Sequence, residues 1–300
     1  MDARPIDLPA RTDGGHAAGM ALVTASAIFF ALAGVFTRSI SAGPWTIVCW
    51  RGLVGAAIIA AYVFWRGRGP QMWSSLRLGK RGWALAVVGA LSSIAFIAAF
   101  KLTYVANVTI IYATVPFMAA GLERVLMGER TRKSTVIAAA MSLTGVAIMM
   151  LGGIGTGSLA GNLMAVLMTA GCALYMVLIR KFTDAPVVWS GAVAAFLLFL
   201  VGCVVTDPLD VTGHDAILMC AFGVSFAAAV ILWTEGTLLV SASESGLLGS
   251  TEVPLAILFA WLFLGEVPPQ ASLAGGAIVI VAIFGYAALD FRSARTDPPL

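Results

Sequence analysis

Residues 187–206 read VVWSGAVAAFLLFLVGCVVT, twenty positions without one charged side chain. An α-helix needs about 20 apolar residues to cross the hydrocarbon core of a bilayer. The whole chain has this character, since 60% of its 300 residues are hydrophobic and 11% are charged, whereas about 25% are charged in an average soluble domain. A soluble protein of this composition would expose contiguous apolar surface and aggregate. The sequence therefore predicts an all-α membrane protein.

Charged and turn-forming residues divide the chain into ten apolar stretches of similar length. The connections between them are short, so no room remains for a soluble domain. We expect ten transmembrane helices, over residues 18–37, 46–65, 83–102, 106–127, 134–152, 159–179, 187–206, 216–236, 246–264 and 271–290.

The basic residues predict the orientation of these helices. If the N-terminus is inside, fifteen of the eighteen Lys and Arg residues lie in tails and connections on the inner side. Arg38 and Lys101 lie on the other side, and Arg51 lies within the second stretch. An excess of Lys and Arg marks cytoplasmic segments. We expect a multi-pass protein of the bacterial inner (plasma) membrane, with both termini in the cytoplasm.

The two halves of the chain show a weak internal repeat. A shift of 142 residues aligns landmarks in the first two stretches of each half, and a shift of 137 or 138 aligns landmarks in the fourth and fifth. The aligned pairs are Gly19 with Gly161, Ala31-Leu32 with Ala173-Leu174, Arg38 with Arg180, Pro44 with Pro186, Pro116 with Pro254, and Met127-Gly128-Glu129 with Leu264-Gly265-Glu266.

Each repeat holds five stretches, an odd number, so the second copy must enter the membrane upside down relative to the first. Inverted repeats are a recurrent plan of secondary transporters, with the substrate site near the midplane between the halves. We expect a cytoplasmic tail (1–17), a first five-helix repeat (18–152), a periplasmic linker (153–158), a second five-helix repeat (159–290) and a cytoplasmic tail (291–300).

The repeated proline and Gly-Glu patterns resemble those of the EamA-type branch of the drug/metabolite transporter superfamily. The residues that carry the resemblance are Val115-Pro116 with Gly128-Glu129, Glu252-Val253-Pro254 with Gly265-Glu266, and Arg51. Among these transporters the chain is most similar to bacterial exporters of aromatic and other amino acids. The resemblance implies a ten-helix carrier that alternates between outward-open and inward-open states. It also implies a central cavity lined by the first, third, fourth, sixth, eighth and ninth helices.

Glu252 is the acidic side chain expected deepest in the membrane. A carboxylate at the centre of a bilayer costs about 2.5–3.5 kcal/mol, so it should face protein or water rather than lipid. Three roles fit it: a proton carrier, a counter-charge for a substrate ammonium, or an internal hydrogen-bond partner.

Pro116 and Pro254 are the two prolines expected inside membrane stretches. Each removes a backbone donor and frees the carbonyl four residues earlier, that of Tyr112 or Ser250. An unpaired carbonyl in lipid costs several kcal/mol unless protein, water or substrate satisfies it. We expect both prolines to act as hinges beside the cavity, although neighbouring Ser or Thr hydroxyls could also satisfy the carbonyls.

Polar and aromatic side chains complete the expected substrate site. Hydroxyl groups suit the carboxylate of an amino acid, and rings supply an apolar wall. The substrate-binding residues that we expect are Ser93, Phe96, Tyr112, Thr114, Tyr175, Trp233, Ser250, Thr251 and Glu252.

Other functions fit the sequence less well. An exporter of cationic drugs or other small metabolites is the nearest alternative, and a second deep carboxylate would favour it. A membrane enzyme would need clustered catalytic groups, but the two histidines, His16 and His214, fall outside the stretches. A sensor or assembly protein would leave the matched prolines and Glu252 without a purpose. We expect no enzyme activity, cofactor, metal or nucleic acid; the partners would be amino acids, the lipid bilayer and protons.

Overall fold

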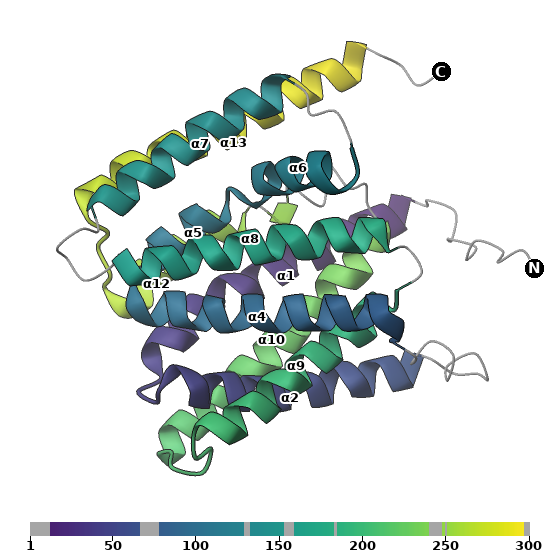
Figure 1. Cartoon of the computed structure of the whole chain (residues 1–300), viewed down its shortest axis with the longest axis vertical. Helices are drawn as coiled ribbons and strands as arrows, with labels where there is room; N and C mark the ends of the chain where they lie inside the picture. The colour runs from purple at the N-terminus through teal and green to yellow at the C-terminus, as the bar shows by residue number, and fades with distance from the viewer. Residues whose placement is uncertain are drawn as a thin grey trace, which may run out of the picture.

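A computed structural model describes residues 13–66, 78–128, 133–152, 159–182, 185–239, 248–249 and 251–296. These residues are helical apart from short connections (Figure 1). The helices are α1 (Asp13–Ser39), α2 (Pro44–Arg66), α4 (Gly79–Leu102), α5 (Val105–Tyr112), α6 (Val115–Leu126), α7 (Lys133–Gly152), α8 (Leu159–Lys181), α9 (Val187–Val205), α10 (Gly213–Leu239), α12 (Glu252–Leu264) and α13 (Gln270–Thr296).

Length and apolar character make seven helical segments of the described chain candidates for crossing a membrane. They are Gly15–Ser39, Pro44–Arg66, Gly79–Leu102, Val105–Leu126, Leu159–Lys181, Val187–Val205 and Gly213–Thr237. Three further apolar segments, Val136–Ile148, Glu252–Leu264 and Gln270–Ala282, are shorter. Large apolar side chains such as Leu91, Val204 and Ile217 are exposed on the outside of the bundle. Lipid would solvate them, so the chain is a multi-pass membrane protein.

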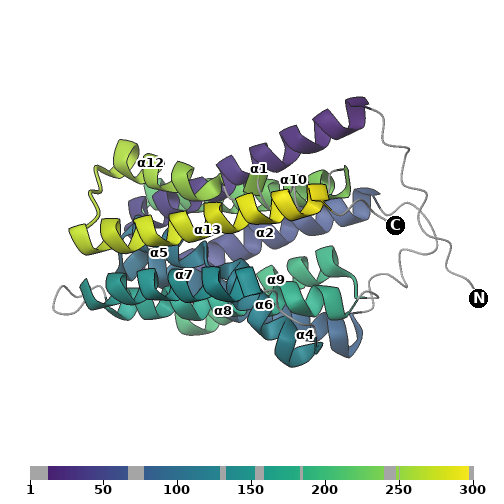
Figure 2. The same ribbon diagram turned by 90° about the horizontal axis from the view of Figure 1, so that it is seen from above.

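Helices from the two halves of the chain pack against one another throughout the bundle. α1 packs along α10, α4 along α8, and α2 along α9. α7 and α13 form a pair at one side of the molecule, where their main contacts are with each other (Figure 1). The start of α1 and the end of α13 lie at the same end of the bundle (Figure 2). We call this the terminal end, and the opposite one the distal end.

Small residues let the helices approach closely. A side chain at Gly52 of α2 would lie 2.5 Å from the carbonyl oxygen of Ala195 in α9. A side chain at Gly202 of α9 would lie 2.4 Å from Cβ of Cys49 in α2. Lipid supplies no hydrophobic force between helices, so close backbone packing of this kind holds membrane bundles together.

The fourth apolar stretch differs from the single helix expected over 106–127. It consists of α5 and α6, which are separated by a turn at Ala113 and Thr114. Pro116 is the second residue of α6, and Pro254 is the third residue of α12. Both prolines therefore occupy a first helical turn, where a missing backbone N–H removes no intrahelical bond. The prediction that they lie in the interior of continuous helices is wrong for Pro116, because the helix ends before it.

Candidate functional site

Glu252 begins α12, and this places its carboxylate at the positive end of the helix dipole. The preceding residue, Thr251, is fixed by its hydroxyl, which donates to the carbonyl of Leu248 at 2.6 Å. The Glu252 side chain is half-buried, and no described residue forms a hydrogen bond or ion pair with it.

Two side chains from other helices interact with the Glu252 carboxylate, and a third interacts with one of these two. Tyr112 at the end of α5 and Cys172 in α8 each interact with the Glu252 carboxylate. Tyr175, one helical turn after Cys172, interacts in turn with the Cys172 thiol. All four side chains are half-buried. We call Tyr112, Cys172, Tyr175 and Glu252 the Glu252 cluster. It joins α5 of the first half to α8 and α12 of the second.

The two threonines expected in the site have matching local structures. Thr114 precedes α6, and its hydroxyl donates to the carbonyl of Ile111 at 2.7 Å. Thr251 precedes α12 and makes the equivalent bond to Leu248. Each hydroxyl thus satisfies a carbonyl beside the start of a proline-containing helix. Neither hydroxyl proton is then available to a ligand in this conformation.

The remaining expected residues fall into two places. Ser93 and Phe96 of α4 lie beside Arg51, and the Arg51 side chain donates to the Ser93 hydroxyl. The ring of Trp233 in α10 lies against Gly249, where an added Cβ would be 2.7 Å from a ring carbon. Trp233 therefore packs next to the segment that leads into α12. Ser250 lies outside the described residues.

Arg51 is not among the binding residues expected from the sequence. In the structure it is a charged side chain buried between helices. It is 2% exposed, and its guanidinium carbon lies 5.5, 5.3 and 4.3 Å from the ring centroids of Phe96, Phe222 and Phe226. Its Nε atom is buried without a hydrogen-bond partner. The sequence signal was present, because Arg51 is a lone charge inside an apolar stretch.

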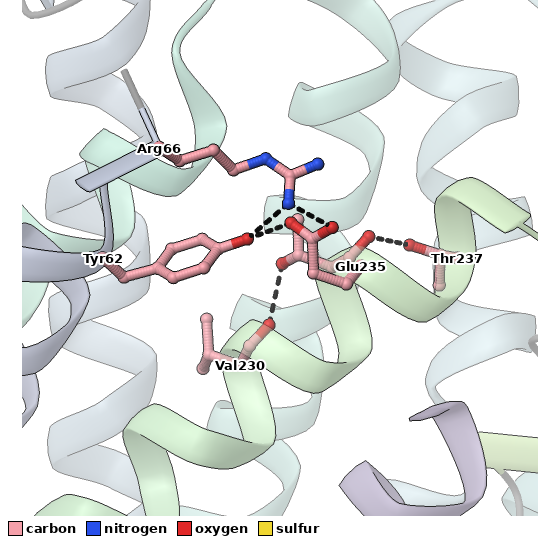
Figure 3. Close-up of polar contacts among 6 residues, drawn as sticks. Tyr62, Arg66, Val230, Glu235 and Thr237 are labelled. Atoms are coloured by element: carbon pink, nitrogen blue, oxygen red, sulfur yellow. Dashed lines mark hydrogen bonds and ion pairs between the residues drawn. The ribbon is translucent and has the colours of Figure 1, made fainter. Parts of the chain in front are cut away.

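Ionic contacts tie the two halves together at the terminal end. Tyr62 and Arg66 at the end of α2 contact Glu235 near the end of α10 (Figure 3). The Tyr62 hydroxyl donates to the Glu235 carboxylate, and Arg66 Nη1 lies 2.6 Å from Glu235 Oε2. A second contact joins Arg180 of α8 to Glu123 of α6. Both link a helix of one half to a helix of the other.

At the distal end, carboxylate side chains of the second half accept hydrogen bonds from backbone N–H groups of the first half. The Asp215 carboxylate accepts from the backbone N–H groups of Ser41 and Ala42, at 3.0 and 3.1 Å. Glu266 accepts from the Val105 N–H at 2.6 Å and lies 3.8 Å from Arg38. Burial raises the pKa of the Glu266 carboxyl above its ordinary value, and the Val105 N–H and Arg38 oppose that rise.

The Gly-Glu pattern has a structural reason at this end. Gly265 has a left-handed backbone, with φ of 63°, and ends α12. Its N–H and that of Glu266 donate to the carbonyls of Trp261 and Ala260. Gly128 in the first half is also left-handed, with φ of 74°. Glycine takes this conformation without steric cost, which explains its place after both helices.

A model of the EamA-like transporter family matches residues 17–151 and again residues 159–288. The chain belongs to the EamA-like transporter family. It therefore carries two copies of the family's repeat, and it is a membrane transporter of small molecules. The family is one of transporters rather than enzymes.

Solved structures show the same fold. Matches extend to 26 chains of known structure. One of them, described only as the crystal structure of a protein, is 21% identical, covers 93% of this chain and 99% of its own length, and has a TM-score of 0.66. No curated protein matches the chain. Among the described residues, no group of three or more His, Cys, Asp and Glu side chains could hold a metal ion.

Proposed function

We propose that this EamA-like transporter exports amino acids, aromatic and other neutral ones, across the bacterial inner membrane. Transport would proceed by alternating access around a central site formed by the Glu252 cluster. The observation that carries the proposal is the Glu252 carboxylate, which lies at a helix start without a described partner and interacts with Tyr112 and Cys172. A substrate ammonium is a natural counter-charge for such a group.

The packing of the helices supports two inverted repeats. In the proposed repeat, α8, α9, α10 and α13 correspond to α1, α2, α4 and α7. Exchanging the halves turns the α1–α10 pair into α8–α4, and both pairs pack extensively. The same exchange leaves the α2–α9 and α7–α13 pairs unchanged. This two-fold pattern is the one expected when ten helices form two five-helix copies of opposite orientation.

Charge supports a cytoplasmic location for the terminal end. At this end lie six basic residues whose side chains the structure describes, against Arg38 and Lys101 at the distal end. By the rule that cytoplasmic segments carry more Lys and Arg, the terminal end would face the cytoplasm. The six residues are Arg66, Lys80, Arg81, Arg124, Arg180 and Lys181.

The ties at the two ends support a rocking mechanism. At each end, contacts join a helix of one half to a helix or connection of the other. Opening the cytoplasmic end would break the Glu235 and Glu123 contacts, and opening the distal end would release Asp215 and Glu266. Pro116 and Pro254, at the starts of α6 and α12, are the proposed hinges, because a helix start absorbs rotation more easily than a helix interior.

The chemistry of the cluster favours a neutral amino acid over a cationic drug. The cluster has a single carboxylate, whereas a strongly cationic substrate would favour a second one. The Tyr112 and Tyr175 rings supply an apolar wall that suits an aromatic side chain. Glu252 would bind the ammonium group, carry a coupling proton, or do both in turn. Export of cationic drugs or other small metabolites is the alternative, and a membrane enzyme is a remote one.

The test is uptake of radiolabelled phenylalanine, threonine and methionine into proteoliposomes that contain the purified protein. We expect saturable uptake above that of empty liposomes, and competition by unlabelled amino acids. Absence of uptake for all three, in protein that elutes as a folded species and has helical circular dichroism, would contradict an amino-acid substrate. Uptake of a labelled cationic dye by the same proteoliposomes would then support the alternative.

A further inference from the structure

Arg51 is a buried cation whose charge is not neutralised by any described residue. The part of the chain that the structure describes offers it one hydrogen bond, to Ser93, and three aromatic rings. No ion pair joins it to Glu252 among the described contacts. Rings stabilise a guanidinium through its charge, but they do not replace an anion. The positive charge therefore has no anionic partner within the described part of the chain.

At least one donor of Arg51 has no partner among the described residues. A guanidinium has five N–H groups in a planar fork that matches a carboxylate with two parallel bonds. Here one nitrogen donates to Ser93, and Nε is buried without a partner. A buried donor left unsatisfied costs free energy, and a charge within a membrane helix costs more. An anionic ligand would remove both costs.

We propose that Arg51 is an anion subsite that binds the carboxylate of the transported substrate. This inference deepens the proposed function and rests on it for the amino-acid identity of the substrate. The phenylalanine rings around the guanidinium exclude water, so a carboxylate that arrives there forms bonds of full strength. Arg51, Ser93, Phe96, Phe222 and Phe226 would form the subsite, from α2, α4 and α10.

The subsite lies in the same part of the bundle as the Glu252 cluster. The Phe96 ring lies beside the guanidinium of Arg51, and Phe96 packs on the same buried core cluster as Tyr112 and Cys172. In this proposal, an α-amino acid meets Arg51 through its carboxylate and Glu252 through its ammonium group. Arg51 is closed off in this conformation, and a rocking movement of α2, α4 and α10 would open it.

The experiment compares three ligands that differ in one charged group. Purified wild-type protein in detergent is titrated by calorimetry with phenylalanine, phenylalaninamide and phenylacetate. A charge-assisted bond is worth about ten- to hundredfold in affinity. We expect phenylalanine to bind about ten- to hundredfold more tightly than its amide, and phenylacetate to bind measurably. Equal binding of phenylalanine and the amide by the wild type would overturn the inference without any variant.

Variants test whether Arg51 causes the difference in affinity between phenylalanine and its amide. In Arg51→Gln the ratio of amide to phenylalanine dissociation constants should fall to near one, while the affinity for the amide stays the same. Arg51→Lys should keep part of the ratio, and it serves if Arg51→Gln fails to fold. The matched control is Arg81→Gln, because Arg81 also lies over a ring, that of Phe182, but at the terminal end of α4. That variant should keep the full ratio.

The outcomes separate this inference from the proposed function. Binding of phenylacetate but not of phenylalanine would support the anion subsite and contradict an amino-acid substrate. Binding of phenylalanine with a ratio that Arg51→Gln leaves unchanged would overturn the subsite and leave the amino-acid substrate standing. Binding of none of the three ligands would overturn both.

Discussion

Glu252 and Arg51 are charged residues inside membrane helices, and such residues point to functional sites. Both carry charges at a depth where charge is expensive, and both lack a described ionic partner. For Glu252 the sequence alone suggested a function, because the residue precedes a repeated proline. For Arg51 the sequence showed a lone charge in an apolar stretch but not its surroundings, because the three rings that surround it come from α4 and α10, far away in the sequence. Side-chain neighbours of this kind cannot be derived from one-dimensional spacing.

Glu266 gives a pH dependence that can be measured at the residue scale. Burial raises the pKa of its carboxyl in the folded protein. Such a group stabilises the fold at pH values below its ordinary pKa of about 4.3, and this stabilisation is lost as the pH rises through the folded-state pKa. The thermal midpoint of the wild type, relative to Glu266→Gln, should therefore fall as the pH rises above about 4.3.

The measurement is thermal unfolding in detergent at several pH values. Asp210→Asn is the control, because it removes an exposed carboxylate at the same end of the bundle. A wild-type midpoint that rises relative to Glu266→Gln with increasing pH would contradict the account. It would mean that Arg38 and the Val105 N–H lower the pKa of Glu266 by more than burial raises it.

At the scale of single helices, the broken fourth stretch is the main departure from expectation. Hydropathy marked 106–127 as one helix, because an apolar run does not reveal where a backbone changes direction. The turn at Ala113 and Thr114 separates α5 from α6, and the Thr114 hydroxyl satisfies a carbonyl at the break. Pro116 was a usable signal, since proline disfavours a helical conformation in the residue before it. Discontinuous helices of this kind are common at transporter binding sites.

The hinge proposal predicts a change in rate rather than in binding. Replacing Pro116 or Pro254 by Ala should allow each helix to extend toward its N-terminus. We expect several-fold slower transport with phenylalanine affinity unchanged. Pro44→Ala, at the first residue of α2, is the control and should leave the rate unchanged. Initial uptake rates and calorimetric affinities of the three variants test this. Full rates in both Pro116→Ala and Pro254→Ala would rule out the hinges.

Close helix packing predicts a second effect at this scale. In Gly52→Ala the new methyl group would meet the backbone of α9, with Ala195 O at 2.5 Å and Phe199 N at 2.7 Å. A backbone cannot move aside as a side chain can, so we expect a loss of about 1–3 kcal/mol. Gly191→Ala is the control, because nothing lies within 4 Å of its added Cβ. It should be neutral or slightly stabilising.

The thermal midpoints of the two glycine variants in detergent decide this prediction. A Gly52→Ala midpoint equal to that of Gly191→Ala would show that α2 and α9 can separate without cost. The close approach of the two helices would then contribute little to the stability of the bundle.

At the scale of the whole molecule, composition and charge were enough to predict a helical membrane protein. The pairs Gly128-Glu129 and Gly265-Glu266 pointed to the family, and the family match over both halves confirms the family and its two repeats. Packing partners could not be predicted, because they depend on which small residues face one another. The Asp215 contact with the α1–α2 connection is an example, since 173 or 174 positions separate the two residues of each bond.

We propose above all that substrate binds at Glu252, between the two halves, and crosses the membrane there. Phenylalanine counterflow in proteoliposomes tests it most directly, with wild-type protein compared with Glu252→Gln at several pH values. We predict saturable counterflow by the wild type and at least a tenfold loss in Glu252→Gln, with Asp210→Asn, which removes an exposed carboxylate, close to wild type. A tenfold change is what the loss of about 1.4 kcal/mol would cause. Normal counterflow by folded Glu252→Gln at every pH would contradict the claim.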